Sequence, residues 1–207
     1  MFDEAFIQRA IIAAPAILFA LTVHEFFHAW TAMKFGDNTA KNLGRLTLNP
    51  LAHLDLFGTI MFFASSFMFG WAKPVPVNPF NLRNPRVADF WISAAGPISN
   101  FGLAIIFGAI FRTLADLDIP EGLYRFLRIS VIVNLGLACF NLIPLFPLDG
   151  SHILRNILPE SYGPALDRFE SISPFILIIL IILGAFAIIL GPMIYFFFQL
   201  LTGTPIY

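Results

Sequence analysis

The chain has 207 residues, of which 58% are hydrophobic and only 12% are charged, and its mean hydropathy is +0.81. A soluble core of this size cannot bury so much apolar surface, so the composition predicts a polytopic membrane protein that forms a single domain over residues 1–207. The net charge of -1, without a basic run, gives no argument for nucleic acid, and we expect no such partner. The single cysteine, Cys139, excludes an intrachain disulfide.

The first apolar run covers residues 10–33 and is long enough for a helix that crosses ~30 Å of hydrocarbon. Acidic residues precede it, and we expect a retained helix instead of a cleaved signal peptide. The motif His24-Glu25-x-x-His28 lies inside this run. Ionisable groups at membrane depth cost at least ~2.5 kcal/mol each on insertion scales, so by default they mark a functional site.

Two histidines four residues apart project from the same face of a helix. This spacing is typical of zinc binding, with the glutamate of the motif left as general base. Catalytic zinc usually has three protein ligands, so one more is needed. Asp149 is the best candidate, and His53 and His152 are its rivals. The alternative for the histidine pair is a structural role, in which polar side chains join membrane helices by hydrogen bonds.

The next segments are shorter. Leucines alternate with polar residues over 43–48, which predicts a short amphipathic strand. Residues 56–71 are apolar but marginal in length for a crossing, and we expect them to enter the membrane and return. Prolines exclude a helix over 73–79 and predict an extended edge segment. An unwound substrate is expected to pair with the 43–48 strand by strand addition, with residues 74–77 nearby.

Two further spans are predicted at residues 90–111 and 129–148, the second interrupted by prolines. The last run, 174–201, is long enough for one tilted crossing or for a crossing broken at Gly191-Pro192. The predicted fold class is therefore an all-α polytopic membrane protein. It has about four to five transmembrane helices, a re-entrant segment and a short membrane-associated β-hairpin or strand.

Charged loops predict the orientation of the chain. If residues 56–71 return to the side on which they entered, Asp149 and the end of the first helix that carries the histidines reach one face. Most of the 12 lysines and arginines then share that face. The positive-inside rule makes it cytosolic, and we expect an integral protein of a prokaryotic plasma membrane with its active site toward the cytosol.

Three motifs together resemble the site-2 protease family of intramembrane zinc metalloproteases. They are His24-Glu25-x-x-His28, Gly96-Pro97-x-x-Asn100 and Asn141-x-x-Pro144-x-x-Pro147-Leu148-Asp149-Gly150. The resemblance implies one zinc ion per chain on His24, His28 and Asp149, with Glu25 as base, and it implies that Asn141 lies near the substrate. The chain is similar to the minimal form of the family, which lacks a PDZ or CBS module.

We therefore expect a zinc-dependent endopeptidase that hydrolyses peptide bonds within or near transmembrane segments of other membrane proteins. Its partners are those segments and the lipid bilayer. Asn141, Asn100 and His152 are candidates for substrate binding or oxyanion stabilisation, and His53 is a candidate auxiliary metal ligand. The structural alternatives are a helix N-cap for Asp149 and a helix-to-helix hydrogen bond for Asn100. The alternative function is a membrane zinc transporter or metal-binding protein without hydrolytic activity.

Overall fold

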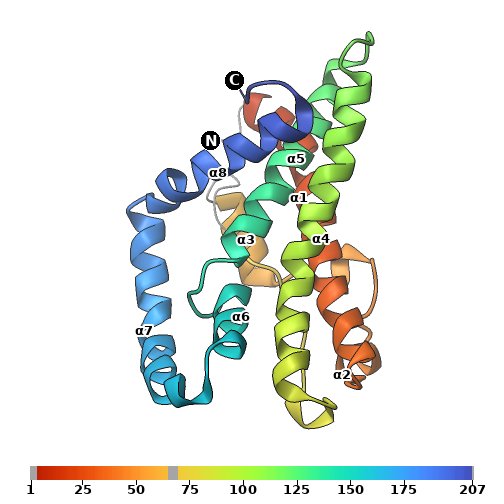
Figure 1. The fold of residues 1–207 in the computed structure, drawn as a ribbon. Coiled ribbons are helices and arrows are strands. Elements are labelled where there is room, and N and C mark those ends of the chain that lie inside the picture. The colour runs from red at the N-terminus through yellow and green to blue at the C-terminus, as the bar shows by residue number, and fades with distance from the viewer. Residues whose placement is uncertain (1–3, 65–69, 207) are drawn as a thin grey trace.

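The computed structural model describes residues 4–64 and 70–206, and this part of the chain is mostly helical (Figure 1). Its α-helices are α1 (Glu4–Lys34), α2 (Thr39–Asn42), α3 (Leu56–Ala64), α4 (Pro85–Leu114), α5 (Glu121–Asn141), α6 (Asp149–Ile157), α7 (Gly163–Ile182) and α8 (Ala185–Thr202). Short 3-10 turns lie at Pro50–Ala52, Pro79–Asn81 and Glu160–Tyr162.

Four of these helices are long and apolar enough to cross a membrane, namely α1 from Ala10 onward, α4, α5 and α8. The shortest, α8, has 18 residues and extends about 27 Å at 1.5 Å per residue, close to the ~30 Å of a hydrocarbon core. The chain is therefore an integral membrane protein, and its all-helical spanning part agrees with the prediction.

The centre of the fold is the bundle of α1, α4 and α5, which lie side by side and contact one another in every pair (Figure 1). Small side chains fill the interfaces: Ala20, Ala29 and Ala32 of α1 are fully buried, as are Ala88 and Ala104 of α4. Small residues let membrane helices approach closely, because no large side chain separates their backbones. The helix with the paired histidines is thus held directly against α4.

After α5 the chain turns sharply and starts α6, which packs on α4. The last apolar run is divided between two helices, α7 and α8. Gly184 has φ +65°, a left-handed conformation that suits glycine, and it separates α7 from α8. Of the alternatives left open for this run, a crossing broken at Gly191-Pro192 is wrong, because both residues lie inside α8.

The strand predicted over residues 43–48 is also wrong, because these residues form turns and bends. The alternation misled because it is the polar residue that points inward: Arg45 is 7% exposed, whereas Leu43 and Leu48 are 64% and 58% exposed. Among the described residues, β pairing is limited to an isolated antiparallel bridge between Leu54 and Ala72.

That bridge brings together the two ends of the apolar segment 56–71. Within the segment, α3 has 9 residues and extends about 14 Å, too short for a crossing. Residues 65–69 lie outside the described part of the chain. The segment therefore returns to the level at which it started, and its re-entry into a bilayer stays a prediction.

Candidate metal centre

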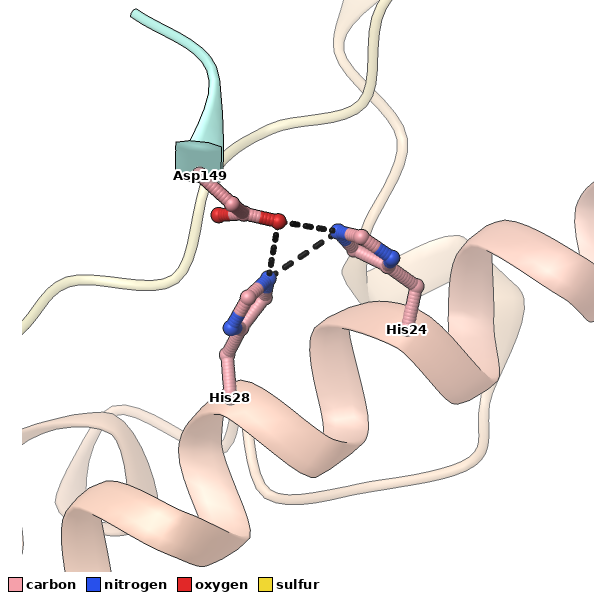
Figure 2. A group of neighbouring side chains, drawn as sticks. All are labelled: His24, His28 and Asp149. Carbon is pink, nitrogen blue, oxygen red and sulfur yellow. Dashed lines mark hydrogen bonds and ion pairs between the residues drawn. The ribbon is translucent and has the colours of Figure 1, made fainter. Parts of the chain in front are cut away.

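The three predicted ligand residues come together (Figure 2). On α1, the rings of His24 and His28 point to the same side, and their Nε2 atoms are 2.9 Å apart. The Oδ2 atom of Asp149, at the start of α6, lies 3.3 Å from Nε2 of His24 and 3.4 Å from Nε2 of His28. Two histidines and one carboxylate thus converge from two helices that are distant in the sequence.

Asp149 reaches this point because α5 stops early. Pro144 and Pro147 cannot donate backbone hydrogen bonds, so the chain between α5 and α6 leaves helical geometry and turns back. Gly150 is required at the turn, because a Cβ there would lie 2.4 Å from the carbonyl oxygen of Leu142. Leu145 and Leu148 of the turn pack against Leu177 of α7 and anchor it.

The far ring nitrogens of both histidines are hydrogen-bonded, and these bonds fix the tautomers. Nδ1 of His28 lies 2.7 Å from the carbonyl oxygen of Ile92, which can only accept, so this Nδ1 carries the proton. Nδ1 of His24 lies 2.6 Å from Oδ1 of Asn100. In the neutral rings both Nε2 atoms therefore present lone pairs to each other and to the Asp149 carboxylate.

Asn100 is oriented in turn by a chain of amides. Its Nδ2 donates to the carbonyl of Ala20 and to Oδ1 of Asn134, at 3.1 and 2.9 Å, which leaves Oδ1 to accept from His24. Nδ2 of Asn134 donates to the carbonyl of Ser130 on its own helix. Both asparagines are fully buried. Sequence reasoning had given Asn134 no role, and its only signal was a polar residue inside an apolar span.

Gly96 provides the space that the rings occupy. A Cβ at this position would lie 2.5 Å from Cε1 of His24 and 2.5 Å from Nε2 of His28. No side chain fits there, so the glycine of the Gly96-Pro97 motif allows α4 to approach α1 at the level of the site. The motif thus serves the metal centre with its glycine and with Asn100, one turn further along α4.

These residues fit a zinc ion. Three lone-pair atoms of the ligands face a common point, and Oδ2 of Asp149 is buried without a hydrogen-bond partner in the described part of the chain. Ligand atoms about 2.0–2.1 Å from tetrahedral zinc lie about 3.3 Å from one another, close to the observed separations. Two imidazoles and one carboxylate also form a donor set typical of catalytic zinc, with the fourth position open.

Comparison with known proteins gives the family. YwhC of Bacillus subtilis, whose name assigns it provisionally to the zinc metalloproteases, is 39% identical over 184 residues, which cover 86% of this chain and 83% of YwhC. A family model described as peptidase family M50 matches residues 117–184, which include Asp149. The chain belongs to peptidase family M50.

Other M50 relatives carry similar names. Zinc metalloprotease MJ0392 of Methanocaldococcus jannaschii is 30% identical over 72% of this chain and 36% of its own length. Rip2 of Mycolicibacterium smegmatis, also assigned provisionally to the zinc metalloproteases, is 28% identical over 91% of this chain and 73% of its own length. No solved structure matches the chain. The names support zinc protease chemistry for the M50 site and agree with the resemblance seen in the sequence.

The predicted general base of this M50 chain, Glu25, follows His24 directly and is 9% exposed. Its Oε2 accepts a hydrogen bond from the backbone N–H of Val75, at 3.0 Å. Val75 belongs to segment 73–78, which has no regular secondary structure and follows the isolated bridge. The carboxylate of Glu25 is therefore held by a loop and not by another helix.

Two other predicted site residues, Asn141 and His152, lie outside the three-residue ligand group. Asn141, at the end of α5, donates to the carbonyl of Leu137 on its own helix, 3.0 Å away. His152 lies one turn beyond Asp149, with Nδ1 3.4 Å from Oδ2 of Asp89. That hydrogen bond is the main cause of a raised pKa for His152, although burial opposes it.

His53 is outside the group that could hold a metal in the described part of the chain. It is 2% exposed, and its Nε2 donates to the carbonyl of Thr47, 2.8 Å away. Its Nδ1 lies 3.4 Å from a guanidinium nitrogen of Arg45. Both ring nitrogens are thus engaged in the loop, and an auxiliary ligand role for His53 stays a prediction without support from this geometry.

Proposed function

We propose that this M50 peptidase is a zinc-dependent intramembrane endopeptidase that cuts transmembrane segments of other membrane proteins. One observation carries the proposal. The three ligand atoms converge at a buried point between α1, α4 and α6, and two of them lie well inside the membrane-spanning part of α1. A hydrolytic site at that depth suits a substrate that is itself embedded in the bilayer.

Each residue has a defined task in hydrolysis. His24, His28 and Asp149 hold the metal, and the buried amides of Asn100 and Asn134 orient His24. When bound, zinc supplies a Lewis acid that polarises the scissile carbonyl and activates water. Glu25 lies next to the ligands, and its carboxylate accepts a hydrogen bond from the backbone N–H of Val75. It accepts the proton of the attacking water and returns it to the leaving amine.

The proposed orientation places the site toward the cytosol of a prokaryotic plasma membrane. Lys34 ends α1 about two turns beyond His28. Lys41, Lys73 and Arg83 follow in the connection between α1 and α4, and Arg86 lies in the first turn of α4. Arg86 also binds the backbone carbonyls of Asn156 and Leu158, which brings the end of α6 to the same side. This concentration of positive charge supports a cytosolic face by the positive-inside rule.

Purified protein in detergent, assayed for zinc content and for cleavage of a panel of transmembrane peptides, tests the proposal. We expect one zinc per chain in the wild type and cleavage within or near the apolar segment. Glu25→Gln should retain zinc and lose cleavage by at least ~100-fold, because it removes the base but no ligand. Asp149→Ala should lose both.

The same assay separates the protease from a zinc transporter. If the protein is a transporter, Glu25→Gln should alter zinc affinity or zinc flux in liposomes. Neither the wild type nor the variant should then cleave a peptide. Zinc uptake by wild-type liposomes without cleavage of any peptide would overturn the proposed function.

A further inference from the structure

Arg45 is a buried cation without a carboxylate partner in the described part of the chain. It is 7% exposed, and its hydrogen bonds are with two backbone carbonyls and the ring of His53. Nη2 donates to the carbonyl of Lys73 at 2.5 Å, and Nη1 donates to the carbonyl of Pro74 at 3.3 Å. Nε has no hydrogen-bond partner among these residues. Burial of a charge is costly, so a guanidinium in this position must do something that an apolar side chain would not.

The site around Arg45 is built to receive the guanidinium. His53 donates from Nε2 to the carbonyl of Thr47, so its Nδ1 carries a lone pair and faces Nη2 of Arg45. The carbonyl of His53 accepts from the backbone N–H of Lys73, at 2.8 Å. The ring and the backbone of His53 thus align Arg45 and the 73–74 backbone with each other.

Arg45 binds the carbonyls of Lys73 and Pro74. These two residues come immediately before Val75, whose N–H donates to Glu25. Pro74 and Pro76 have no N–H, so between Lys73 and Val77 the N–H of Val75 is the only backbone donor available to a neighbouring group. That N–H is used on Oε2 of Glu25 at 3.0 Å. The position of the Val75 donor therefore depends on where the backbone of 73–74 is fixed.

We infer that Arg45 is a positioning residue for the catalytic base. By holding the carbonyls of Lys73 and Pro74, it places the N–H of Val75 where it orients the carboxylate of Glu25 beside the metal ligands. The inference rests on the proposed function, since it assigns Arg45 to the base of the same reaction. It predicts that a substitution in a loop, away from the metal ligands, lowers turnover without removing zinc.

Amide hydrogen exchange tests the hydrogen bond from Val75 to Glu25 directly, and it does not require an active enzyme. The segment 73–77 has three exchangeable amides, at Lys73, Val75 and Val77, because the intervening residues are prolines. In Arg45→Met the Val75 amide should exchange about tenfold faster than in the wild type, the factor expected for the loss of one hydrogen bond. Glu25→Ala should give the same result, and Arg45→Lys should retain part of the protection.

Lys41→Met is the matched control, because it removes an exposed cation four residues away. We expect it to leave the exchange unchanged. Equal exchange of Val75 in the wild type and in Arg45→Met would overturn the inference, whether or not the protein cleaves a peptide. If Arg45→Met does not fold, Arg45→Lys decides instead: faster exchange of the Val75 amide than in the wild type supports the inference, and exchange equal to that of the wild type overturns it.

Kinetics add a second readout. In Arg45→Met, kcat should fall about 10- to 100-fold while KM and zinc content stay at their wild-type values, because the base is misplaced but the substrate and the metal are not. Val75→Pro removes the donor itself, and kcat should fall in that variant as well. In the double variant the two losses should not multiply, since both act through one hydrogen bond.

The outcomes distinguish this inference from the proposed function. A higher KM with unchanged kcat, or losses that multiply in the double variant, would mean that Arg45 acts on something other than the base. If the wild type cleaves no peptide, the proposed function fails, and the exchange experiment still decides whether Arg45 places the Val75 donor.

Discussion

The metal centre and the loop beside it both bury charged or polar groups, but they fix these groups by different means. The ligands are carried by helices, and each histidine is oriented by one atom of α4. The loop, residues 37–55 and 72–82, uses buried Asp37 and Arg45 to bind the backbone of distant segments. A hydrogen bond from Val75 to Glu25 connects the loop to the predicted base.

The helices therefore hold the metal ligands, whereas the loop positions the predicted base, Glu25. Ligand geometry depends on how closely α1 and α4 pack, so it resists changes in the loop. The position of Glu25 depends on a segment without regular secondary structure, which is fixed by a few side-chain hydrogen bonds. We therefore expect substitutions in the helical region to affect zinc and substitutions in the loop to affect turnover and stability.

The largest expected effect is that of Gly96→Ala. The new Cβ would lie 2.5 Å from Nε2 of His28, and both atoms belong to rigid groups, so α1 and α4 must separate or the ring must turn away. Zinc binding should be lost, as measured by metal analysis of the purified protein. Gly102→Ala is the control on the same helix, because a Cβ there would meet no atom of another described segment within 4 Å. Normal zinc content in Gly96→Ala would contradict the close packing described here.

A smaller effect is expected from Asn134→Leu. It removes the acceptor for Nδ2 of Asn100, which then no longer presents its oxygen to His24 in a fixed orientation. Loss of such a supporting hydrogen bond typically weakens metal affinity about 10- to 100-fold. Competition with a zinc chelator measures the change. Asn141→Leu is the comparison, because Asn141 bonds only its own helix among the described residues, and it should keep wild-type zinc affinity.

The two regions also differ in how far sequence could predict them. His24 and His28 could be placed together because a spacing of four on a helix puts them on one face whatever surrounds them. Asp149 could be added because the prolines before it end the helix. The loop could not be predicted, since the inward orientation of Arg45 depends on carbonyls 28 and 29 residues away. The alternation over residues 43–48 looked like a strand for the same reason.

The last span shows a similar limit. A glycine next to a proline is the stronger local signal for a break, yet the helix is interrupted at Gly184, which has a left-handed conformation. Packing of α7 on Leu145 and Leu148, and of α8 on α4 and α5, decides between the two positions. Contacts of this kind, between segments far apart in the sequence, are not visible in any single run of residues.

The smallest effect, and the one most specific to the loop, concerns Asp37. Its carboxylate is fully buried and accepts bonds from the N–H and hydroxyl of Thr39, from the N–H of Asn78 and from the amide of Asn81. Burial alone would raise its pKa, but these four donors lower it below the ordinary value. Asp37→Asn should cost about 1.5 kcal/mol at pH 7, since it replaces a charged acceptor by a neutral one.

The pH dependence of stability tests whether Asp37 is bound as an anion. Because the pKa of Asp37 is lower in the folded protein, its contribution is fully present above the unfolded value of about 3.9 and is lost as the pH falls through the folded pKa. The stability difference between the wild type and Asp37→Asn, followed by denaturation in detergent, should therefore be constant from pH 7 to 5 and close below about pH 4. Asp118→Asn, at an exposed position, should show no difference at any pH. A stability difference between the wild type and Asp37→Asn that increased on acidification would mean that the carboxylate is bound in its protonated form. Asp37 would then not connect α2 to the segment before α4 as an anion.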